Sequence, residues 1–414
     1  MCAQRDTRSP RAHACHVAGA QQNDYIAMSE ISRRDVSGIT EKGKSIMMGR
    51  LRAMREPLKY VQGRNALLKF QEEMGYMGTR WLFVCSKSGY QACHDKLEES
   101  FGQREDYRRY EIFGGVSSHS EIDKMKAIVE EDKIDTVVAV GGGSAVDTAK
   151  ATAFYTGKHI VIIPTVAATD APCTGLSVIY NDDHSFDKYL FYPTNPDAVL
   201  VDTVVIANAP VKFLIAGMGD ALGTFFEGRA SIRTESASLE GTGITRAGQA
   251  LAKLCYDTLR AYGKQAVEAC KVHAVTPALE AIVEANVYLS GVGADNVNCA
   301  AAHSFYNGVT ALGIAHADHG CCVAFGTLVQ LVLEGATQEE FDEVQNFCLE
   351  VGLPVTLAEI GVTTKEQIAS IAEHACVPGE TIHNLAGDVQ PIELYDAILQ
   401  ADAMGKRALG QTSC

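Results

Sequence analysis

Short, unbroken runs of apolar residues recur in the first half of the chain, and helical stretches separate them. We predict strands at 81–85, 134–140, 159–164 and 198–202, where aliphatic and aromatic residues follow one another. Strands that are apolar on both faces are typical of a parallel sheet covered by helices on both sides. The alternation of strand and helix predicts a Rossmann-like α/β domain, which we place at residues 49–208.

The pattern changes near residue 209. Beyond this point, strand patterns fade and long segments rich in Ala and Leu carry Glu and Lys on their other positions. The run 278–290 is one example, and its apolar residues recur at helical spacing: Leu279, Ile282, Val283 and Val287. We predict an all-α domain over residues 209–414.

Residues 1–48 show neither a helical nor a strand period. Arg5, Arg8 and Arg11 give a faint resemblance to an organelle transit peptide, while Met47 and Met48 directly precede the patterned sequence. We expect a disordered extension or an upstream start codon, with organelle targeting as the alternative.

Composition narrows the class of protein. A net charge of −15 argues against nucleic-acid binding, which rests on clusters of Lys and Arg. No apolar run approaches the roughly 20 residues that span a bilayer, so we expect no membrane association. The 13 cysteines are scattered in a long chain without a signal peptide, which favours free thiols in the cytoplasm. Cys321 and Cys322 are adjacent, and neighbouring side chains diverge, which disfavours them as metal ligands.

Three glycines, Gly141, Gly142 and Gly143, follow a predicted strand and open a predicted helix. Glycine lets the backbone turn sharply and approach a ligand closely. The free N–H groups of the following helix would then face that ligand, which suits a pyrophosphate. The spacing matches neither G-x-G-x-x-G nor a P-loop, so a plain tight turn is the alternative.

Three polar residues stand out in the second half: Asp220 after Gly219, and His303 and His319, which lie sixteen residues apart. Alone, Asp220 could cap a helix, and each histidine could be an ordinary core or surface residue. A glycine turn followed by Asp, His and His in this order is the pattern of metal-dependent polyol dehydrogenases. From about residue 60 to residue 400, the chain resembles the glycerol dehydrogenases of the iron-containing alcohol dehydrogenase superfamily.

The resemblance implies a dehydroquinate synthase-like architecture with the active site in the cleft between the two domains. It implies that Asp220, His303 and His319 hold one zinc ion, with iron as the alternative, and are the catalytic residues. Such a set leaves positions open for substrate, as in catalytic zinc sites. The metal would lower the pKa of a glycerol hydroxyl, and hydride transfer to NAD would give dihydroxyacetone. Asp170 and His303 would bind the substrate, although Asp170 could instead bond its own loop backbone.

The resemblance also implies a set of cofactor-binding residues: Ser86, Gly141, Gly142, Gly143, Ser144, Asp147, Thr165, Ala168, Thr174, Leu176 and Tyr180. Two of these positions depart from the family pattern. Similar glycerol dehydrogenases commonly have Lys where Ser144 stands. NAD-dependent relatives have a ribose-binding Asp where Ser86 stands, and Ser86 is followed by Lys87. An Asp repels a 2′-phosphate, so its loss leaves NADP open beside the expected NAD.

Several alternatives remain at this point. His316 could replace His319 as the second imidazole ligand, and Tyr306 stands where bacterial relatives have another His. A related alcohol or 1,2-diol dehydrogenase, possibly NADP-linked, is the alternative function. Relatives that act on phosphorylated substrates would need basic residues, and no such cluster lies near the metal motifs. A non-catalytic nucleotide-binding module would be expected to lack the metal ligands. The expected partners are a small polyol and other copies of the chain, an octamer by resemblance.

Overall fold

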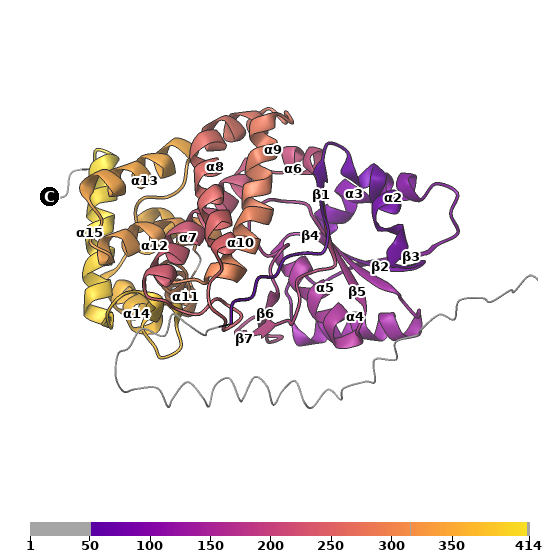
Figure 1. The fold of residues 1–414 in the computed structure, drawn as a ribbon, viewed down its shortest axis with the longest axis horizontal. Coiled ribbons are helices and arrows are strands. Elements are labelled where there is room, and N and C mark those ends of the chain that lie inside the picture. The colour runs from indigo at the N-terminus through magenta and orange to yellow at the C-terminus, as the bar shows by residue number, and fades with distance from the viewer. Residues whose placement is uncertain (1–50, 315, 412–414) are drawn as a thin grey trace, which may run out of the picture. The chain divides into compact units, whose positions relative to one another are not determined.

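The computed structural model describes residues 51–314 and 316–411, and the predictions for residues 1–48 lie outside this range. Six parallel strands form one sheet in the order β1-β8-β5-β4-β2-β3 (Figure 1). Their bounds are Tyr60–Gly63 (β1), Arg80–Cys85 (β2), Tyr107–Ile112 (β3), Thr136–Gly141 (β4), His159–Pro164 (β5) and Ala198–Asp202 (β8). The four predicted strands are therefore confirmed as β2, β4, β5 and β8.

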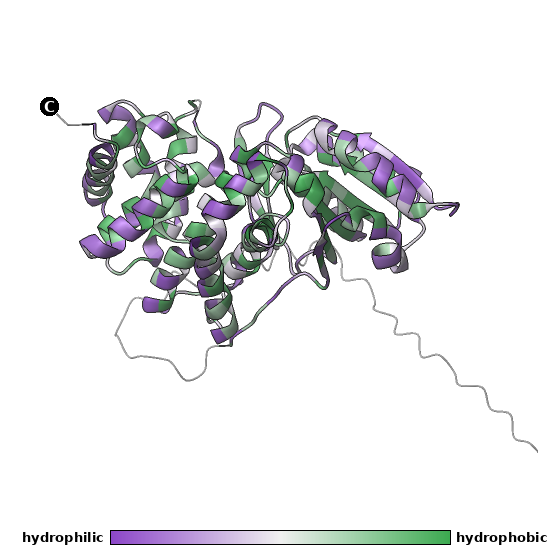
Figure 2. Ribbon diagram, turned by 90° about the horizontal axis from the view of Figure 1, so that it is seen from above, coloured by the Kyte–Doolittle hydropathy of each residue, from purple (hydrophilic) through white to green (hydrophobic). Residues whose placement is uncertain are grey.

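The inner strands β4 and β8 are buried along their whole length. Because successive side chains of a strand point in opposite directions, each of these strands contributes to a core on both faces of the sheet. In β4, Val137 and Ala139 belong to one hydrophobic cluster, whereas Val138 and Val140 belong to another. In Figure 2 the inner strands of the sheet are drawn mostly in green, the colour of hydrophobic residues. This double burial explains why the central strands are unbroken apolar runs.

Helices cover the two faces. Residues of α4 (His119–Glu131) and α5 (Gly143–Thr156) pack into the first cluster. Residues of α2 (Phe70–Met74) and α3 (Lys87–Phe101) pack into the second, on the opposite side of the sheet (Figure 1). The α/β prediction for this part of the chain is confirmed.

The strand order changes direction beside β2. After β2 the chain adds β3 on one side, and it then crosses to place β4 on the other. In open α/β sheets, ligands bind at the carboxyl ends of strands where the order reverses in this way. The loop after β2 and the glycine turn after β4 both lie at this point.

The sequence patterns did not predict β1, β3 or the antiparallel hairpin of β6 (Leu176–Tyr180) and β7 (Phe186–Phe191). The edge strand β3 includes Arg108 and Arg109, and most of β7 is exposed to solvent. Neither strand therefore forms a continuous apolar run.

From residue 203 onward the regular elements of the described residues are helical, as predicted. The α-helices are α6 (Thr203–Asn208), α7 (Val211–Arg233), α8 (Arg246–Lys271), α9 (Pro277–Glu284), α10 (Ser290–Val297), α11 (Ala301–Ala311), α12 (His319–Leu333), α13 (Gln338–Val351), α14 (Lys365–Ala375) and α15 (Pro391–Ala408). Short 3₁₀ turns span Ala66–Lys69, Gly75–Met77, Ala358–Ile360 and Thr381–Asn384. Within residues 51–314 and 316–411, none of the helices combines the length and hydropathy needed to cross a membrane.

The predicted single helix over 278–290 is wrong in one respect, because a π-helical turn at Ala285–Leu289 separates α9 from α10. At this turn the buried Asn286 side chain donates hydrogen bonds of 3.0 Å to the carbonyl oxygens of both Ala167 and Leu214. Such turns are frequent at functional sites.

One buried hydrophobic cluster includes residues from both halves of the chain, such as Val137 in the sheet and Leu222 in α7. The sheet and the helices that follow it therefore share a continuous core. The division into domains at residues 49–208 and 209–414 stays a prediction.

Candidate metal and cofactor site

Helices α7 and α12 cross at two glycines. A Cβ atom on Gly219 would lie 2.1 Å from the Gly320 carbonyl oxygen, and one on Gly320 would lie 1.8 Å from that of Ala216. No side chain fits into such a contact, so the helices pack backbone against backbone. Asp220 and His319 are the chain neighbours of these glycines, and the close crossing brings their side chains together.

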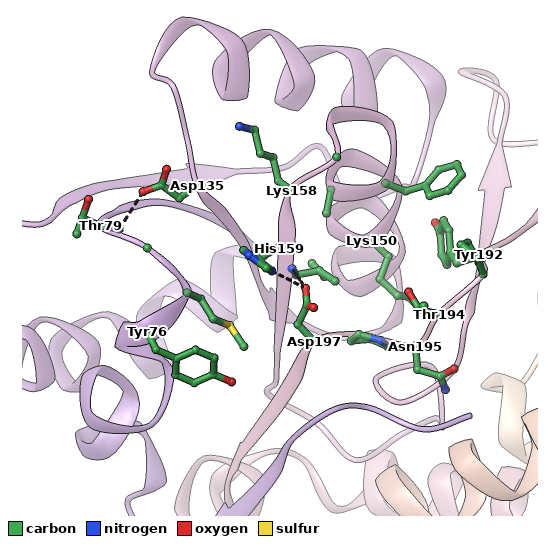
Figure 3. A pocket seen from close by; sticks show the side chains of 18 residues that line it. Tyr76, Thr79, Asp135, Lys150, Lys158, His159, Tyr192, Thr194, Asn195 and Asp197 are labelled. Atoms are coloured by element: carbon green, nitrogen blue, oxygen red, sulfur yellow. Dashed lines mark hydrogen bonds and ion pairs between the residues drawn. The ribbon is translucent and has the colours of Figure 1, made fainter. Parts of the chain in front are cut away.

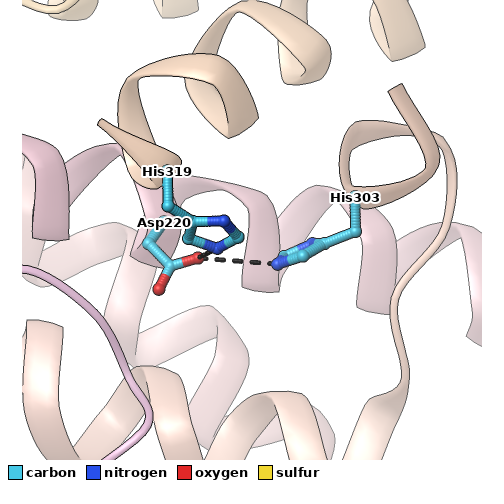
Figure 4. A group of neighbouring side chains, drawn as sticks. All are labelled: Asp220, His303 and His319. Atoms are coloured by element: carbon cyan, nitrogen blue, oxygen red, sulfur yellow. Dashed lines mark hydrogen bonds and ion pairs between the residues drawn. The ribbon is translucent and has the colours of Figure 1, made fainter. Parts of the chain in front are cut away.

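Asp220, His303 and His319 form a compact group with their side chains pointing toward one another (Figure 4). Asp220 Oδ1 lies 3.0 Å from His319 Nε2 and 3.5 Å from His303 Nε2. The ligand atoms of all three residues lie within 4.8 Å of one another. Asp220 is buried and the two histidines are half-buried, so the group is open on the imidazole side. A carboxylate with two imidazoles suits a divalent metal ion and leaves some of its coordination positions open for substrate.

Glu227 fixes the orientation of His303. Its Oε2 lies 2.6 Å from His303 Nδ1, and its Oε1 accepts hydrogen bonds from the backbone N–H groups of His303 and Ala300 at 2.9 and 2.7 Å. A proton held on Nδ1 by this carboxylate leaves the Nε2 lone pair free on the side of Asp220. Carboxylates commonly orient metal-binding histidines in this way.

Sequence reasoning missed Glu227, although a signal was present. Glu227 follows Asp220 by seven residues, about two helical turns, so both carboxylates lie on the same face of α7.

The charges of the group stabilise one another. Burial alone would raise the pKa of Asp220, but His319 and His303 overcome it and hold that pKa well below its usual range. Burial opposes protonation of His303, while Cys299, Glu227 and Asp220 together raise its pKa well above the usual value. Two carboxylates, Asp220 and Glu227, therefore face His303, which suits a cation.

The geometry distinguishes the proposed metal ligands from their alternatives. Asp220 lies inside α7, so its interpretation as a helix cap is wrong. His316 is exposed, and its Nδ1 lies 2.8 Å from the Ala317 carbonyl oxygen. The ring of Tyr306 packs edge-on against His319 with 4.3 Å between centroids. Neither His316 nor the Cys321–Cys322 pair belongs to a candidate metal group among the described residues.

Asp170 lies beside the metal group. Its backbone N–H donates to Asp220 Oδ2 at 3.1 Å, and its Oδ2 accepts from Ser290 Oγ at 3.4 Å. Burial, and then the Asp220 carboxylate, raise the pKa of Asp170 well above its usual range. The structure thus brings the loop after β5 against the candidate metal ligands.

The glycine turn joins β4 to α5 at the reversal of strand order. A Cβ atom on Gly141 would lie 2.7 Å from Ala145 Cβ and 3.1 Å from Ser86 Oγ, so only glycine fits there. The N-cap residue of α5 is Gly142, so no side chain accepts a hydrogen bond from the first N–H groups of the helix. Ser144, in the first turn, is exposed. The first N–H groups of α5 are therefore suited to a phosphate group.

Ser86 lies across from this turn. It caps α3 by accepting a hydrogen bond from the Gly89 N–H at 3.0 Å, and its own N–H donates to the Val140 carbonyl oxygen at 2.9 Å. The next residue, Lys87, is exposed. Ser86 therefore lies where β2 and β4 end side by side.

The remaining predicted cofactor residues lie in α5, in the loop after β5 and in β6. The Thr165 N–H donates to the Gly141 carbonyl oxygen at 3.0 Å. Asp147 is buried, and its Oδ2 accepts from the Val178 N–H at 3.2 Å, which attaches β6 to α5. Leu176 and Tyr180 lie in β6, and Ala168 and Thr174 lie in the preceding loop. Their contacts with a cofactor stay predictions.

A hollow of about 700 Å³ lies at the opposite, amino-terminal edge of the sheet (Figure 3). His159 Nδ1 lies 3.3 Å from Asp197 Oδ2 there, and Asp135 accepts from the Thr79 N–H at 2.9 Å. The metal group and the glycine turn do not line this hollow.

Comparisons with known proteins identify the family of the chain. A family profile described as iron-containing alcohol dehydrogenase matches residues 57–203. A protein of Escherichia coli O6:H1 named glycerol dehydrogenase is 45% identical over 86% of this chain and 98% of its own length. A glycolaldehyde reductase of Halobacterium salinarum is 41% identical over 85% of this chain and 98% of its own. The crystal structure of glycerol dehydrogenase from Schizosaccharomyces pombe superposes with a TM-score of 0.82 at 36% identity, over 88% of this chain and 94% of that one.

These relatives match the chain across both the sheet and the helical part that carries the metal group. The chain belongs to the iron-containing alcohol dehydrogenase family and, within it, to the glycerol dehydrogenases.

Proposed function

We propose that the protein oxidises glycerol to dihydroxyacetone with NAD as hydride acceptor, in the cleft between the sheet and the helices. The observation that carries the proposal is the buried Asp220 carboxylate facing two imidazoles, in a chain 45% identical to a glycerol dehydrogenase.

A single divalent ion, zinc in our proposal, fits Asp220, His303 and His319. The fit rests on the donor set and on the Glu227 carboxylate, which keeps the proton of His303 on Nδ1 and its lone pair on Nε2. When bound, the ion supplies Lewis acidity that lowers the pKa of an alcohol hydroxyl. Because all three ligands are held by packed helices, the site is arranged before the substrate arrives.

NAD is proposed to bind at the reversal of strand order, with its pyrophosphate at the glycine turn Gly141–Gly143 and its nicotinamide near Thr174 and Leu176. The uncapped start of α5 supports this placement. Ser86 brings no negative charge to the end of β2, which favours NADP as a second cofactor.

Asp170 is proposed to hold the hydroxyls of the substrate that do not react. A carboxylate accepts hydrogen bonds from two hydroxyls, and the Asp170 N–H bond to Asp220 keeps this loop beside the metal ligands. The relative named glycolaldehyde reductase supports a second candidate, a related diol or hydroxyaldehyde activity at the same site.

The test is a steady-state assay of the purified protein with glycerol, 1,2-propanediol and ethanol, each with NAD and with NADP. We expect the highest kcat/KM with glycerol and NAD. We also expect loss of activity on chelation and recovery with zinc. Full activity in a sample shown to be metal-free would overturn the mechanism, and a clear preference for another alcohol would overturn the substrate.

The family resemblance also supports an octamer, which analytical ultracentrifugation of the same sample would test.

A further inference from the structure

A buried lysine of α5 binds the loop that follows β5. Lys150 is 3% exposed. Its ammonium group donates hydrogen bonds to three carbonyl oxygens, those of Ala171 at 2.9 Å, Thr174 at 3.2 Å and Leu176. Burial lowers the pKa of Lys150, and the Asp147 carboxylate, 3.7 Å from Nζ, opposes this shift. An ammonium group has three N–H donors, so one short segment of the chain takes all of them.

The segment bound by Lys150 lies between the candidate metal group and the proposed cofactor site. Next to it on the amino-terminal side is Asp170, whose N–H donates to Asp220 Oδ2 at 3.1 Å. Thr174 and Leu176, inside the segment, are the residues that we place near the nicotinamide. Helix α5, which carries Lys150, begins at the glycine turn proposed for the pyrophosphate. Lys150 therefore attaches the helix at the pyrophosphate to the loop between the nicotinamide and the metal.

Two other buried side chains hold the same loop at positions that Lys150 does not bind. Asp295 Oδ2, in α10, accepts a hydrogen bond from the Gly175 N–H at 2.9 Å. Asn195 Nδ2 donates to the Cys173 carbonyl oxygen at 2.6 Å. Because these bonds remain when Lys150 is replaced, we expect its loss to shift and loosen the loop rather than to detach it from the fold.

We propose that Lys150 is a positioning residue for hydride transfer, which fixes the loop 171–176 so that the nicotinamide and the substrate meet at the required distance. Lys150 acts through the backbone of this loop, whereas Asp170 and the metal ligands act on the substrate. Hydride transfer needs the reacting atoms about 3–3.5 Å apart, and a displacement of about 1 Å by a remote change can cost about a hundredfold in rate. The inference rests on the proposed function and deepens it, since it concerns the geometry of the same site.

The experiment compares two variants of Lys150 with a matched control. Lys150→Met keeps the length of the side chain and removes every donor, whereas Lys150→Gln keeps two donors on a shorter, neutral side chain. The control is Lys96→Met. Lys96, in α3, also binds a buried aspartate, but its ammonium group donates to Asp202 Oδ2 at 3.0 Å and Asn65 Oδ1 at 3.1 Å instead of to the loop 171–176.

Each full-length protein is measured with and without its ligands. Thermal unfolding, zinc content and a fluorescence titration with NADH report on the fold and on the two bound groups. Steady-state oxidation of glycerol, well below the unfolding temperature, is repeated with glycerol deuterated at carbon, which gives the kinetic isotope effect. Hydrogen exchange of the peptides that cover 168–180, in protein without cofactor, reports directly on the loop.

We expect Lys150→Met to lower kcat about 10- to 100-fold, with zinc content unchanged and the Kd for NADH changed less than kcat. The isotope effect on kcat should rise, because a misplaced nicotinamide makes the chemical step limit the rate in place of product release. The loop peptides should exchange faster, and Lys150→Gln should fall between the parent and Lys150→Met. Lys96→Met should unfold at a lower temperature but keep the kcat, isotope effect and loop exchange of the parent.

Parental kcat and isotope effect in both Lys150 variants would make Lys150 a purely structural residue and would overturn the inference. A Lys150→Gln protein that does not fold would overturn it too, as would a loss of activity matched by an equal loss of zinc or NADH. A parent protein that does not oxidise glycerol would overturn the proposed function instead, and faster loop exchange in Lys150→Met would still show that Lys150 fixes the loop.

Discussion

Replacing Glu227 with glutamine tests whether this buried carboxylate orients the metal-binding imidazole. In the parent protein, Oε2 faces His303 Nδ1 at 2.6 Å, and Oε1 accepts backbone hydrogen bonds at 2.7 and 2.9 Å. An amide has one accepting oxygen and one donating nitrogen. If its oxygen faces Nδ1, its NH₂ meets two N–H donors. If its NH₂ faces Nδ1, the proton moves to Nε2 and blocks the metal.

The expected loss of metal affinity follows from the hydrogen bonds that the amide cannot make. Partners that hold metal-binding histidines typically contribute 10- to 100-fold in metal affinity, which corresponds to about 1.4 to 2.8 kcal/mol. We therefore expect Glu227→Gln to bind zinc about 10- to 100-fold more weakly in a chelator-competition titration. Excess zinc should restore much of the activity, because the three ligands remain.

The control is Asp202→Asn. Asp202 is also buried and also accepts backbone hydrogen bonds, from Asn65 at 3.1 Å and Val204 at 3.0 Å, but the histidines of the metal group do not contact it. Both variants should unfold at lower temperature than the parent, and only Glu227→Gln should lose zinc affinity. Parental zinc affinity in a destabilised Glu227→Gln would show that Glu227 serves the backbone alone.

Three further changes address the other assignments. His319→Ala should lose bound zinc while His316→Ala keeps it, measured by metal analysis after dialysis; the reverse pattern would move the ligand to His316. Ser86→Asp keeps an acceptor for the cap of α3 but repels a 2′-phosphate, so the NAD/NADP ratio of kcat/KM should rise. The control Ser88→Asp, in the exposed first turn of α3, should change this ratio less. The same ratio in both variants would place the ribose of the cofactor elsewhere. Asp170→Asn should lower kcat/KM for glycerol about tenfold to a hundredfold, with less effect on ethanol and with zinc content unchanged. A cation beside Asp170 favours its charged form against the raised pKa, and a hydrogen bond to a charged group contributes roughly 1.5–3 kcal/mol. A variant that only unfolds earlier would make Asp170 a loop residue.

Sequence patterns identified the elements that are buried on both sides. The strands β2, β4, β5 and β8 are apolar on both faces, so their hydrophobic runs are unbroken and their positions could be predicted. The edge strand β3 carries Arg108 and Arg109 because it has one neighbour and faces solvent. Its register comes from pairing with β2, which the sequence of β3 alone does not specify.

The residues of the candidate site could be predicted from the sequence, but their arrangement could not. Asp220, His303 and His319 could be proposed because their order matched a family pattern, but their convergence depends on the crossing of α7 and α12 at Gly219 and Gly320. That contact joins segments about a hundred residues apart, which local periodicity does not detect. Likewise, the π-helical turn at Ala285–Leu289 lies against the loop after β5 through the Asn286 hydrogen bond to Ala167, a contact that local sequence does not predict.

The Asp220 carboxylate is shared between two tasks, since Oδ1 faces the imidazoles and Oδ2 receives the Asp170 N–H. If Asp170 holds the substrate as we propose, metal affinity and substrate range both depend on the Asp220 carboxylate. A loop transplanted from a relative to accept a bulkier alcohol would also alter the hydrogen bonding of a metal ligand. A change of substrate specificity is then best sought at positions near Asp170, while Asp170 and its backbone N–H bond to Asp220 are kept.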